Sequence, residues 1–295
     1  MSSAVTRPRQ RPTGMSSGGA TAMTWARIRA WPSLTEIMTA LYWNCADKRA
    51  RHDVMAGTYA PRAETRWARH TRPPSVTLPL PLRNRLAELI LESLHDPEAR
   101  RGLEAVAAVC SDPRALTRVA DLPERAPRDL FEERDGGLQV KSGWREYAAE
   151  FRERSRRAWR AIADRPLDPR EAGLGATLGA AGRLFDAGLY YEVHEVLEPC
   201  WMRAEGGDRE ALQGLIQIAV GFQHLANGNA AGARGLLADG CAKTLGRQLH
   251  GLDLDPFARA ARGCLDQVVA RGAAAIQEFD WTAVPRFPNI HTFKE

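Results

Sequence analysis

Two stretches of the chain carry polar side chains at spacings that could do chemistry within otherwise apolar helices. In the first stretch, residues 185–201, His194 and Glu198 lie one helical turn apart, at the edge of a stripe of apolar side chains. In the same helical projection Glu192 and Glu195 point to the far side. We therefore expect His194 and Glu198 to form a half-buried pair.

The second stretch, residues 212–229, carries a polar line along a helix made otherwise of apolar residues. Gln213, Gln217 and His224 fall within roughly 40° of one another when each residue turns the helix by about 100°. Polar groups on so apolar a helix need partners. If the two stretches pack antiparallel through the short connection at 205–209, these three side chains would meet the pair in the first stretch.

The H-E-x-x-E pattern of residues 194–198 resembles the H-E-x-x-H metal motif, in which a helix presents two imidazoles to zinc and the glutamate serves as base. With Glu198 in place of the second histidine, an i, i+4 pair of ligands remains. His224 is the candidate third ligand and Glu195 the candidate base, although Glu195 faces away from His224 in projection. The cofactor would be a divalent metal such as zinc.

Two other interpretations of the same side chains stay open. In one, His194 is hydrogen-bonded to Glu198 or Gln217, and this network ties two helices together without catalysis. In the other, Tyr190, Tyr191, Gln213 and Gln217 bind a small molecule, a peptide or a second copy of the chain. We expect one tyrosine in the core and one at the rim, where a phenol beside His194 could donate to an anion.

The pattern G-x-Y-Y-E-x-H-E-x-L-E at 188–198, with Q-G-L-I-Q at 213–217 and H-x-x-x-G-N at 224–229, resembles the signature of a bacterial family catalogued as domain of unknown function 309. The resemblance covers about residues 170–250, and a similar proline-containing tail lies near 284–290. It implies a small helical domain and the family's usual label, a predicted metal-dependent hydrolase.

Three residues set expectations for how these helices are built. Pro199 lies inside the motif helix, where it removes an amide donor, so we expect it to kink or end the helix early. Gly188 suits the left-handed end of the preceding helix. In the second stretch, Gly214 and Gly221, seven residues apart, leave a line without side chains that would let a neighbouring backbone come close.

The hydrophobic pattern predicts an all-α protein in three parts. Residues 1–75 are expected to be a disordered basic tail, because their first 22 residues are nearly free of apolar side chains. Residues 76–165 read as a small, mostly helical domain, and residues 166–295 as a helical domain that carries the motif. We expect the last part to be a bundle of antiparallel helix pairs.

The middle part contains a D-G-G turn within residues 132–140, which predicts a small hairpin, and a short helix is expected at 113–120. Helices followed by a hairpin also permit a winged-helix interpretation with DNA binding. The absence of a concentrated basic face argues against it. A further helix is expected at 144–163, with its arginines on a solvated face.

Composition narrows the classes of function. Residues 1–75 hold 12 Lys/Arg against 4 Asp/Glu, net +8, which leaves −3 for the rest of a chain of net charge +5. A folded part of slight negative charge argues against nucleic acid as a partner. The chain has no apolar run of about 18 residues, so we expect no membrane span. Five scattered cysteines without a C-x-x-C pair, and no signal-peptide core, favour a cytoplasmic protein with reduced thiols.

Overall fold

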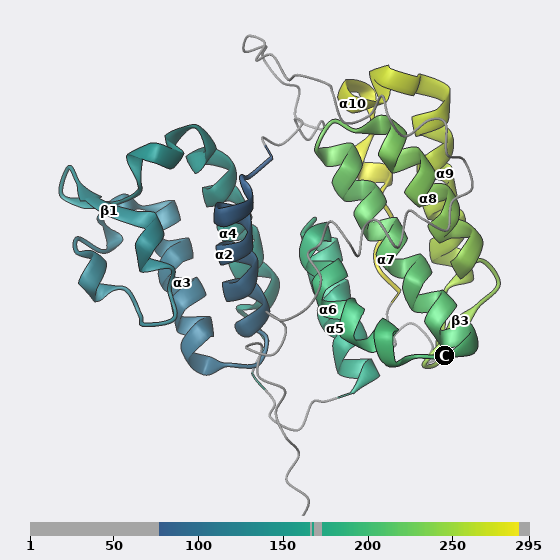
Figure 1. The fold of residues 1–295 in the computed structure, drawn as a ribbon, viewed down its shortest axis with the longest axis horizontal. Coiled ribbons are helices and arrows are strands. Elements are labelled where there is room, and N and C mark those ends of the chain that lie inside the picture. Colours follow the sequence, from purple (N-terminus) through teal and green to yellow (C-terminus); the bar gives the residue numbers. More distant parts are fainter. Residues whose placement is uncertain (1–76, 166, 168–172, 289–295) are drawn as a thin grey trace, which may run out of the picture. The chain divides into compact units, whose positions relative to one another are not determined.

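The computed structural model describes residues 77–165, 167 and 173–288. The expected basic tail at 1–75 lies outside these residues. Within them, helices predominate, and the strands form two small antiparallel hairpins (Figure 1). The predicted all-α class is therefore confirmed. In the described part of the chain, no helix is long and apolar enough to span a membrane.

The first group of elements lies between residues 80 and 162. It comprises α2 (Leu80–Glu92), α3 (Pro97–Ser111), β1 (Phe131–Arg134), β2 (Gly137–Val140) and α4 (Ala148–Ile162). Asp96 caps α3 by accepting a hydrogen bond from the N–H of Glu98, with proline at the first helical position. Asp135 and Gly136 both have positive φ, so the predicted hairpin is present as a tight turn between β1 and β2.

One expected helix in this group is wrong. Residues 113–120 form two short 3₁₀ turns, Pro113–Ala115 and Val119–Asp121, instead of a single helix. Leu116 and Arg118 adopt extended backbone angles between them, so no α-helical turn can propagate.

The second group of elements lies between residues 174 and 278 and contains the motif. It comprises α5 (Leu174–Asp186), α6 (Tyr190–Arg203), α7 (Gly206–Ala226), α8 (Ala230–Thr244), β3 (Gln248–Leu249), β4 (Leu252–Asp253), α9 (Asp255–Arg271) and α10 (Ala275–Glu278). Gly188 ends α5 with φ +67°, as predicted, and the N–H of Leu189 donates to the carbonyl of Leu184. This closed end directs the chain straight into α6.

Pro199 does not end α6, which continues to Arg203. A proline inside a helix removes one backbone hydrogen bond. Here α6 packs between α5 and α7 with Val193 and Leu197 fully buried. The burial of this stripe outweighs the single lost bond, so Glu198 and the residues before it keep helical positions.

The line of glycines on α7 faces α8. A Cβ added at Gly214 would lie 2.9 Å from the carbonyl oxygen of Gly240, and one at Gly221 would lie 2.9 Å from Cγ of Leu237. The predicted close approach of a neighbouring backbone is thus confirmed, and the neighbour is α8. Because α8 packs closely on this face of α7, the two helices form a tightly packed pair, and α7 also packs against the motif helix α6.

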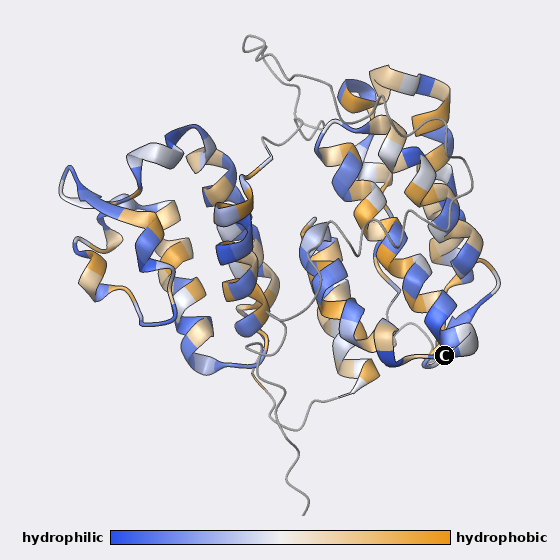
Figure 2. Cartoon of the chain, in the orientation of Figure 1, coloured by the Kyte–Doolittle hydropathy of each residue, from blue (hydrophilic) through white to orange (hydrophobic). Residues whose placement is uncertain are grey.

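The core of the second group is built around Phe185. Its ring lies 5.2 Å from Tyr190, 5.9 Å from Phe222, 5.5 Å from Phe257 and 5.6 Å from Phe287, measured between ring centroids. These rings come from α5, α6, α7, α9 and the segment after α10. Figure 2 shows hydrophobic and hydrophilic residues as separate stripes along the helices, as expected when each helix turns one face to such a core.

Candidate functional site

One group of potential metal ligands lies on α6. His194, Glu195 and Glu198 each offer an atom that lies within 4.8 Å of those of the other two. His194 is 2% exposed, whereas both carboxylates are partly exposed. The spacing explains His194 and Glu198, which are one turn apart. Glu195 was expected to point to the far side, but its carboxylate reaches back to the neighbouring imidazole.

The two ring nitrogens of His194 have different surroundings. Its Nδ1–H donates to Oε1 of Glu195 at 3.1 Å. Its Nε2 faces Oε1 of Glu198 at 4.0 Å, which is too long for a hydrogen bond. That oxygen of Glu198 is buried and has no hydrogen-bond partner among the described residues. The imidazole is therefore fixed on one side and faces an unpaired carboxylate oxygen on the other.

The electrostatics of this group favour an additional cation. Burial raises the pKa of Glu198, an effect that His194 opposes and Glu195 reinforces. Burial also raises the pKa of Tyr191, and the charge of Glu195 adds to the rise while Arg83 opposes it. A raised pKa favours the protonated, neutral carboxyl, and a bound cation would reverse this by stabilising the carboxylate of Glu198.

The donor set fits a divalent metal ion. An imidazole nitrogen binds zinc at about 2.0–2.1 Å and a carboxylate oxygen at about 2.0–2.2 Å. A tetrahedral ion holds two such ligand atoms about 3.4 Å apart. Nε2 of His194 and Oε1 of Glu198, at 4.0 Å, would therefore have to move slightly closer to bind one ion. A metal-bound histidine commonly donates its other N–H to a carboxylate, which is the place that Glu195 occupies.

His224, the predicted third ligand, does not belong to this group. Its Nδ1 accepts a hydrogen bond from the side-chain amide of Asn229 at 2.9 Å, and burial lowers the pKa of the imidazole. The side-chain oxygen of Asn229 accepts from the N–H of Gly232 and so caps α8. A Cβ at Gly232 would lie 2.6 Å from Nδ1 of His224. This contact gives the H-x-x-x-G-N pattern a structural role at the α7–α8 turn.

The two glutamines of α7 make no hydrogen bond to His194 or Glu198 among the described residues. Gln217 is buried, and its Oε1 has no hydrogen-bond partner in the described part of the chain; Gln213 is half-buried. The bond expected from His194 to Glu198 or Gln217 is replaced by the bond from His194 to Glu195. The long side chain of Glu195, one position along the helix, bends back to the imidazole of His194. A projection of Cβ directions does not include this bend.

The two tyrosines divide as predicted into a core and a rim residue. Tyr190 is buried in the cluster around Phe185. Tyr191 is half-buried, and the guanidinium of Arg83 from α2 lies 4.3 Å from its ring centroid. Tyr191 therefore contacts the first group of helices as well as the carboxylate of Glu195.

The buried ion pair of Glu192 and Arg154 was not predicted from the sequence. Glu192 was expected on the far side of α6 and the arginines of residues 144–163 on a solvated face, yet the exposed fraction is 0% for Glu192 and 5% for Arg154. Nη2 of Arg154 donates to the two carboxylate oxygens of Glu192 at 3.0 and 2.8 Å, and Nε donates at 3.1 Å. One signal was available, because Arg154 falls on the apolar stripe of α4 with Phe151 and Ala158.

Comparison with known proteins gives one match. Residues 178–236 match the model of a family described as a domain of unknown function, DUF309. The matched segment contains the group on α6 and also His224 and Asn229. Neither the curated proteins nor the solved structures contain a match to this chain.

Proposed function

We propose a function from the geometry of α6, because the family model that residues 178–236 match is described only as a domain of unknown function. His194 and Glu198 bind a divalent metal ion such as zinc, and the site hydrolyses a small-molecule substrate. One observation carries this proposal: a buried oxygen of Glu198, without a hydrogen-bond partner among the described residues, faces Nε2 of His194 at 4.0 Å.

Each residue of the group has a distinct role in this proposal. His194 and Glu198 hold the ion, and Glu195 keeps the proton of His194 on Nδ1, so that Nε2 presents its lone pair. A bound divalent ion lowers the pKa of water and polarises a carbonyl or phosphoryl oxygen. Glu195 is then a positioning residue, because its carboxylate is engaged by the imidazole that it orients. The base role expected from the H-E-x-x-E pattern is set aside.

The small number of protein ligands suits catalysis better than structural binding. Structural zinc sites are closed by four protein ligands, whereas catalytic sites use three and leave one position for water and substrate. His194 and Glu198 supply two, so water or substrate would fill the other positions. The partly exposed carboxylates of Glu195 and Glu198 mark the side from which a substrate would approach.

Metal analysis of the full-length protein, purified without a histidine tag, tests the proposal directly. We expect stoichiometric zinc or manganese in the wild type and its loss in His194→Ala. His224→Ala is the control, because this half-buried imidazole lies on the neighbouring helix and outside the group. Wild-type protein that binds no metal after dialysis against either ion would refute the proposal.

Hydrolysis needs its own test. The metal-loaded protein is assayed with p-nitrophenyl acetate and bis(p-nitrophenyl) phosphate, which report on acyl and phosphoryl transfer. We expect turnover of one of these substrates, lost in His194→Ala and retained in His224→Ala. Metal binding without turnover of either substrate would leave a metal site and remove the proposed hydrolysis of these two bond types.

A second function is favoured by a different observation. The first turn of α6 is occupied by the same chain, through Arg83 on Tyr191 and Arg154 on Glu192. A non-catalytic module, in which the motif holds another helical segment, explains these contacts without a metal. Metal-free wild-type protein that keeps its fold is the result that would favour this function over the first.

A further inference from the structure

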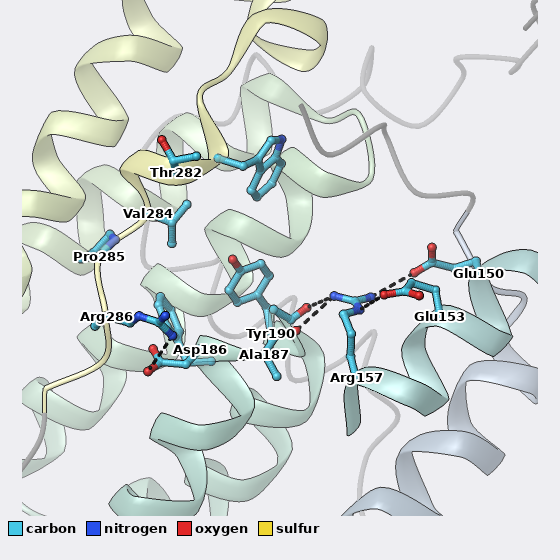
Figure 3. A pocket seen from close by; sticks show the side chains of 13 residues that line it. Glu150, Glu153, Arg157, Asp186, Ala187, Tyr190, Thr282, Val284, Pro285 and Arg286 are labelled. Carbon is cyan, nitrogen blue, oxygen red and sulfur yellow. Dashed lines mark hydrogen bonds and ion pairs between the residues drawn. The ribbon is translucent and has the colours of Figure 1, made fainter. Parts of the chain in front are cut away.

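A cavity of about 580 Å³ lies apart from the group on α6 (Figure 3). It is lined by residues of α4, of the turn between α5 and α6, and of the segment 281–286; His194, Glu195 and Glu198 are not among them. Pockets for small ligands typically measure about 300–1,000 Å³. This cavity is therefore large enough for a small molecule and distinct from the proposed metal site.

One part of the cavity is aromatic and apolar. The buried rings of Phe185 and Tyr190 lie 5.2 Å apart, and Trp281 and Val284 contribute further apolar surface. In Figure 3, Tyr190 lies between the charged residues of α4 and the segment that carries Val284. Aromatic faces attract cations through their quadrupole, and they also bind apolar bodies.

The guanidinium of Arg157 is already held by the protein. Its Nη1 donates to the carbonyls of Ala187 and Gly188 at 3.2 Å each, at the end of α5. Its Nη2 lies 3.5 Å from Glu150 and its Nε 3.9 Å from Glu153. These contacts, drawn in Figure 3, direct the charge of Arg157 toward the protein. An anionic ligand would have to compete with two carboxylates for it.

The remaining charges leave the cavity with an excess of carboxylate. Arg286 lies 3.4 Å from Asp186, whose other oxygen accepts from the N–H of Phe287. Glu150 and Glu153 both lie near Arg157, and the lining itself holds three carboxylates and two guanidiniums. Glu153 also pairs at 3.2 Å with Arg156, which does not line the cavity. This pair is exposed, so a cation at the rim would compete with Arg156 for Glu153.

We propose that this cavity binds an organic cation, an ammonium group on an apolar body, with the ammonium near Glu153 and the apolar body against Tyr190 and Trp281. The excess carboxylate selects the sign of the charge, and the aromatic side chains bind the rest of the molecule. An anion of the same shape is rejected because the guanidinium of Arg157 is occupied by its own neighbours.

Calorimetric titration of the full-length protein with three molecules of similar size tests this proposal. Phenethylammonium carries the proposed charge, phenethyl alcohol is its neutral counterpart, and phenylacetate carries the opposite charge. We expect phenethylammonium to bind about tenfold more tightly than the alcohol, as a cation–π contact with an ion pair would allow. Phenylacetate should bind more weakly than both.

Variants locate the binding within the cavity. Trp281→Leu should weaken phenethylammonium binding about tenfold, and Glu153→Gln about threefold. Glu104→Gln, an exposed carboxylate on α3, is the matched control and should leave the affinity unchanged. Because Glu153 is exposed, its variant keeps the fold even where Trp281→Leu disturbs it.

Four results would overturn the proposal. Equal affinity for phenethylammonium and phenethyl alcohol would show that the charge is not recognised. Tighter binding of phenylacetate would show that the sign is wrong. Absence of phenethylammonium binding at millimolar concentration, or binding unaffected by Glu153→Gln and Trp281→Leu, would show that this cavity is not the site.

Discussion

The motif helix α6 carries two carboxylates with different surroundings. Glu192 meets the guanidinium of Arg154 through three hydrogen bonds of 2.8 to 3.1 Å. Glu198 meets an imidazole at 4.0 Å and has a buried oxygen without a hydrogen-bond partner in the described residues. The first carboxylate is compensated and the second is not.

In our proposal, this difference separates a structural role for Glu192 from a metal-binding role for Glu198. For Arg154, burial alone would lower the pKa, but the carboxylate of Glu192 outweighs it, so the pKa is raised and the guanidinium stays charged. For Glu198, burial raises the pKa and no cation outweighs it. An uncompensated buried charge costs free energy, so a native helix retains one where a ligand completes it.

The largest expected effect is on the compensated side. Arg154→Met leaves the charge of Glu192 buried without a partner and should lower the free energy of unfolding by about 3–5 kcal/mol. Urea denaturation measures this loss. Arg160→Met, on the exposed face of the same helix, should change it by less than about 0.5 kcal/mol.

A double replacement sharpens this result. Arg154→Met with Glu192→Leu removes both charges, so it should recover much of the stability that the single variant loses. If Arg154→Met alone costs less than about 1 kcal/mol, Glu192 is not buried against Arg154 in solution, and the contrast between the two sides of α6 disappears.

The next effect concerns the uncompensated side. Glu195→Ala removes the acceptor that fixes the tautomer of His194, so zinc affinity should fall about 10–100-fold. Competition with a chromogenic chelator measures the affinity. The free energy of unfolding of the metal-free variant should change by less than about 1 kcal/mol, because the carboxylate is partly exposed.

The size of this change distinguishes two roles for Glu195. Complete loss of zinc would make Glu195 a direct ligand, and unchanged affinity would remove its orienting role. Glu278→Ala, an exposed glutamate on α10, is the control and should leave zinc affinity unaffected.

A smaller effect is expected where α2 meets the motif. Arg83→Ala removes the guanidinium that lies 4.3 Å from the ring centroid of Tyr191 and should cost about 0.5–1 kcal/mol of stability. Arg83→Lys should retain part of it. A loss above about 2 kcal/mol would mean that this contact between α2 and α6 contributes as much to stability as a buried ion pair does.

The smallest effect tests whether His224 belongs to either side. Burial lowers the pKa of His224 below its ordinary value of 6.5 in the folded protein. The stability that its neutral form provides is complete above pH 6.5 and is lost as the pH falls through the folded-state pKa. His224→Gln should therefore reduce the acid-induced loss of stability, by less than about 1 kcal/mol.

Urea denaturation between pH 7 and pH 5 follows this change. His95, whose pKa burial also lowers, should show a separate loss of the same sign, so the effect of His95→Gln should add to that of His224→Gln. Zinc affinity that falls in His224→Gln as much as in His194→Ala would place His224 at the metal site and contradict its separation from His194.

The sequence predicted those features that depend on neighbours along the chain. Helical periodicity gave the all-α class, and Gly188 gave the end of α5. Gly214 and Gly221 gave the close approach that α8 makes. His194 and Glu198 were correctly placed on one side of one helix, because their spacing fixes their directions.

The tertiary structure decided which of these side chains are covered and by what. A helical projection of residues 190–203 gives the direction of Glu192, but not the arrival of Arg154 from a helix 38 positions earlier in the chain. A projection of α7 likewise gives the direction of His224, but not its hydrogen bond with Asn229. Periodicity is a property of local backbone geometry, whereas burial and charge compensation depend on the packing of distant segments, which no single stretch of sequence encodes.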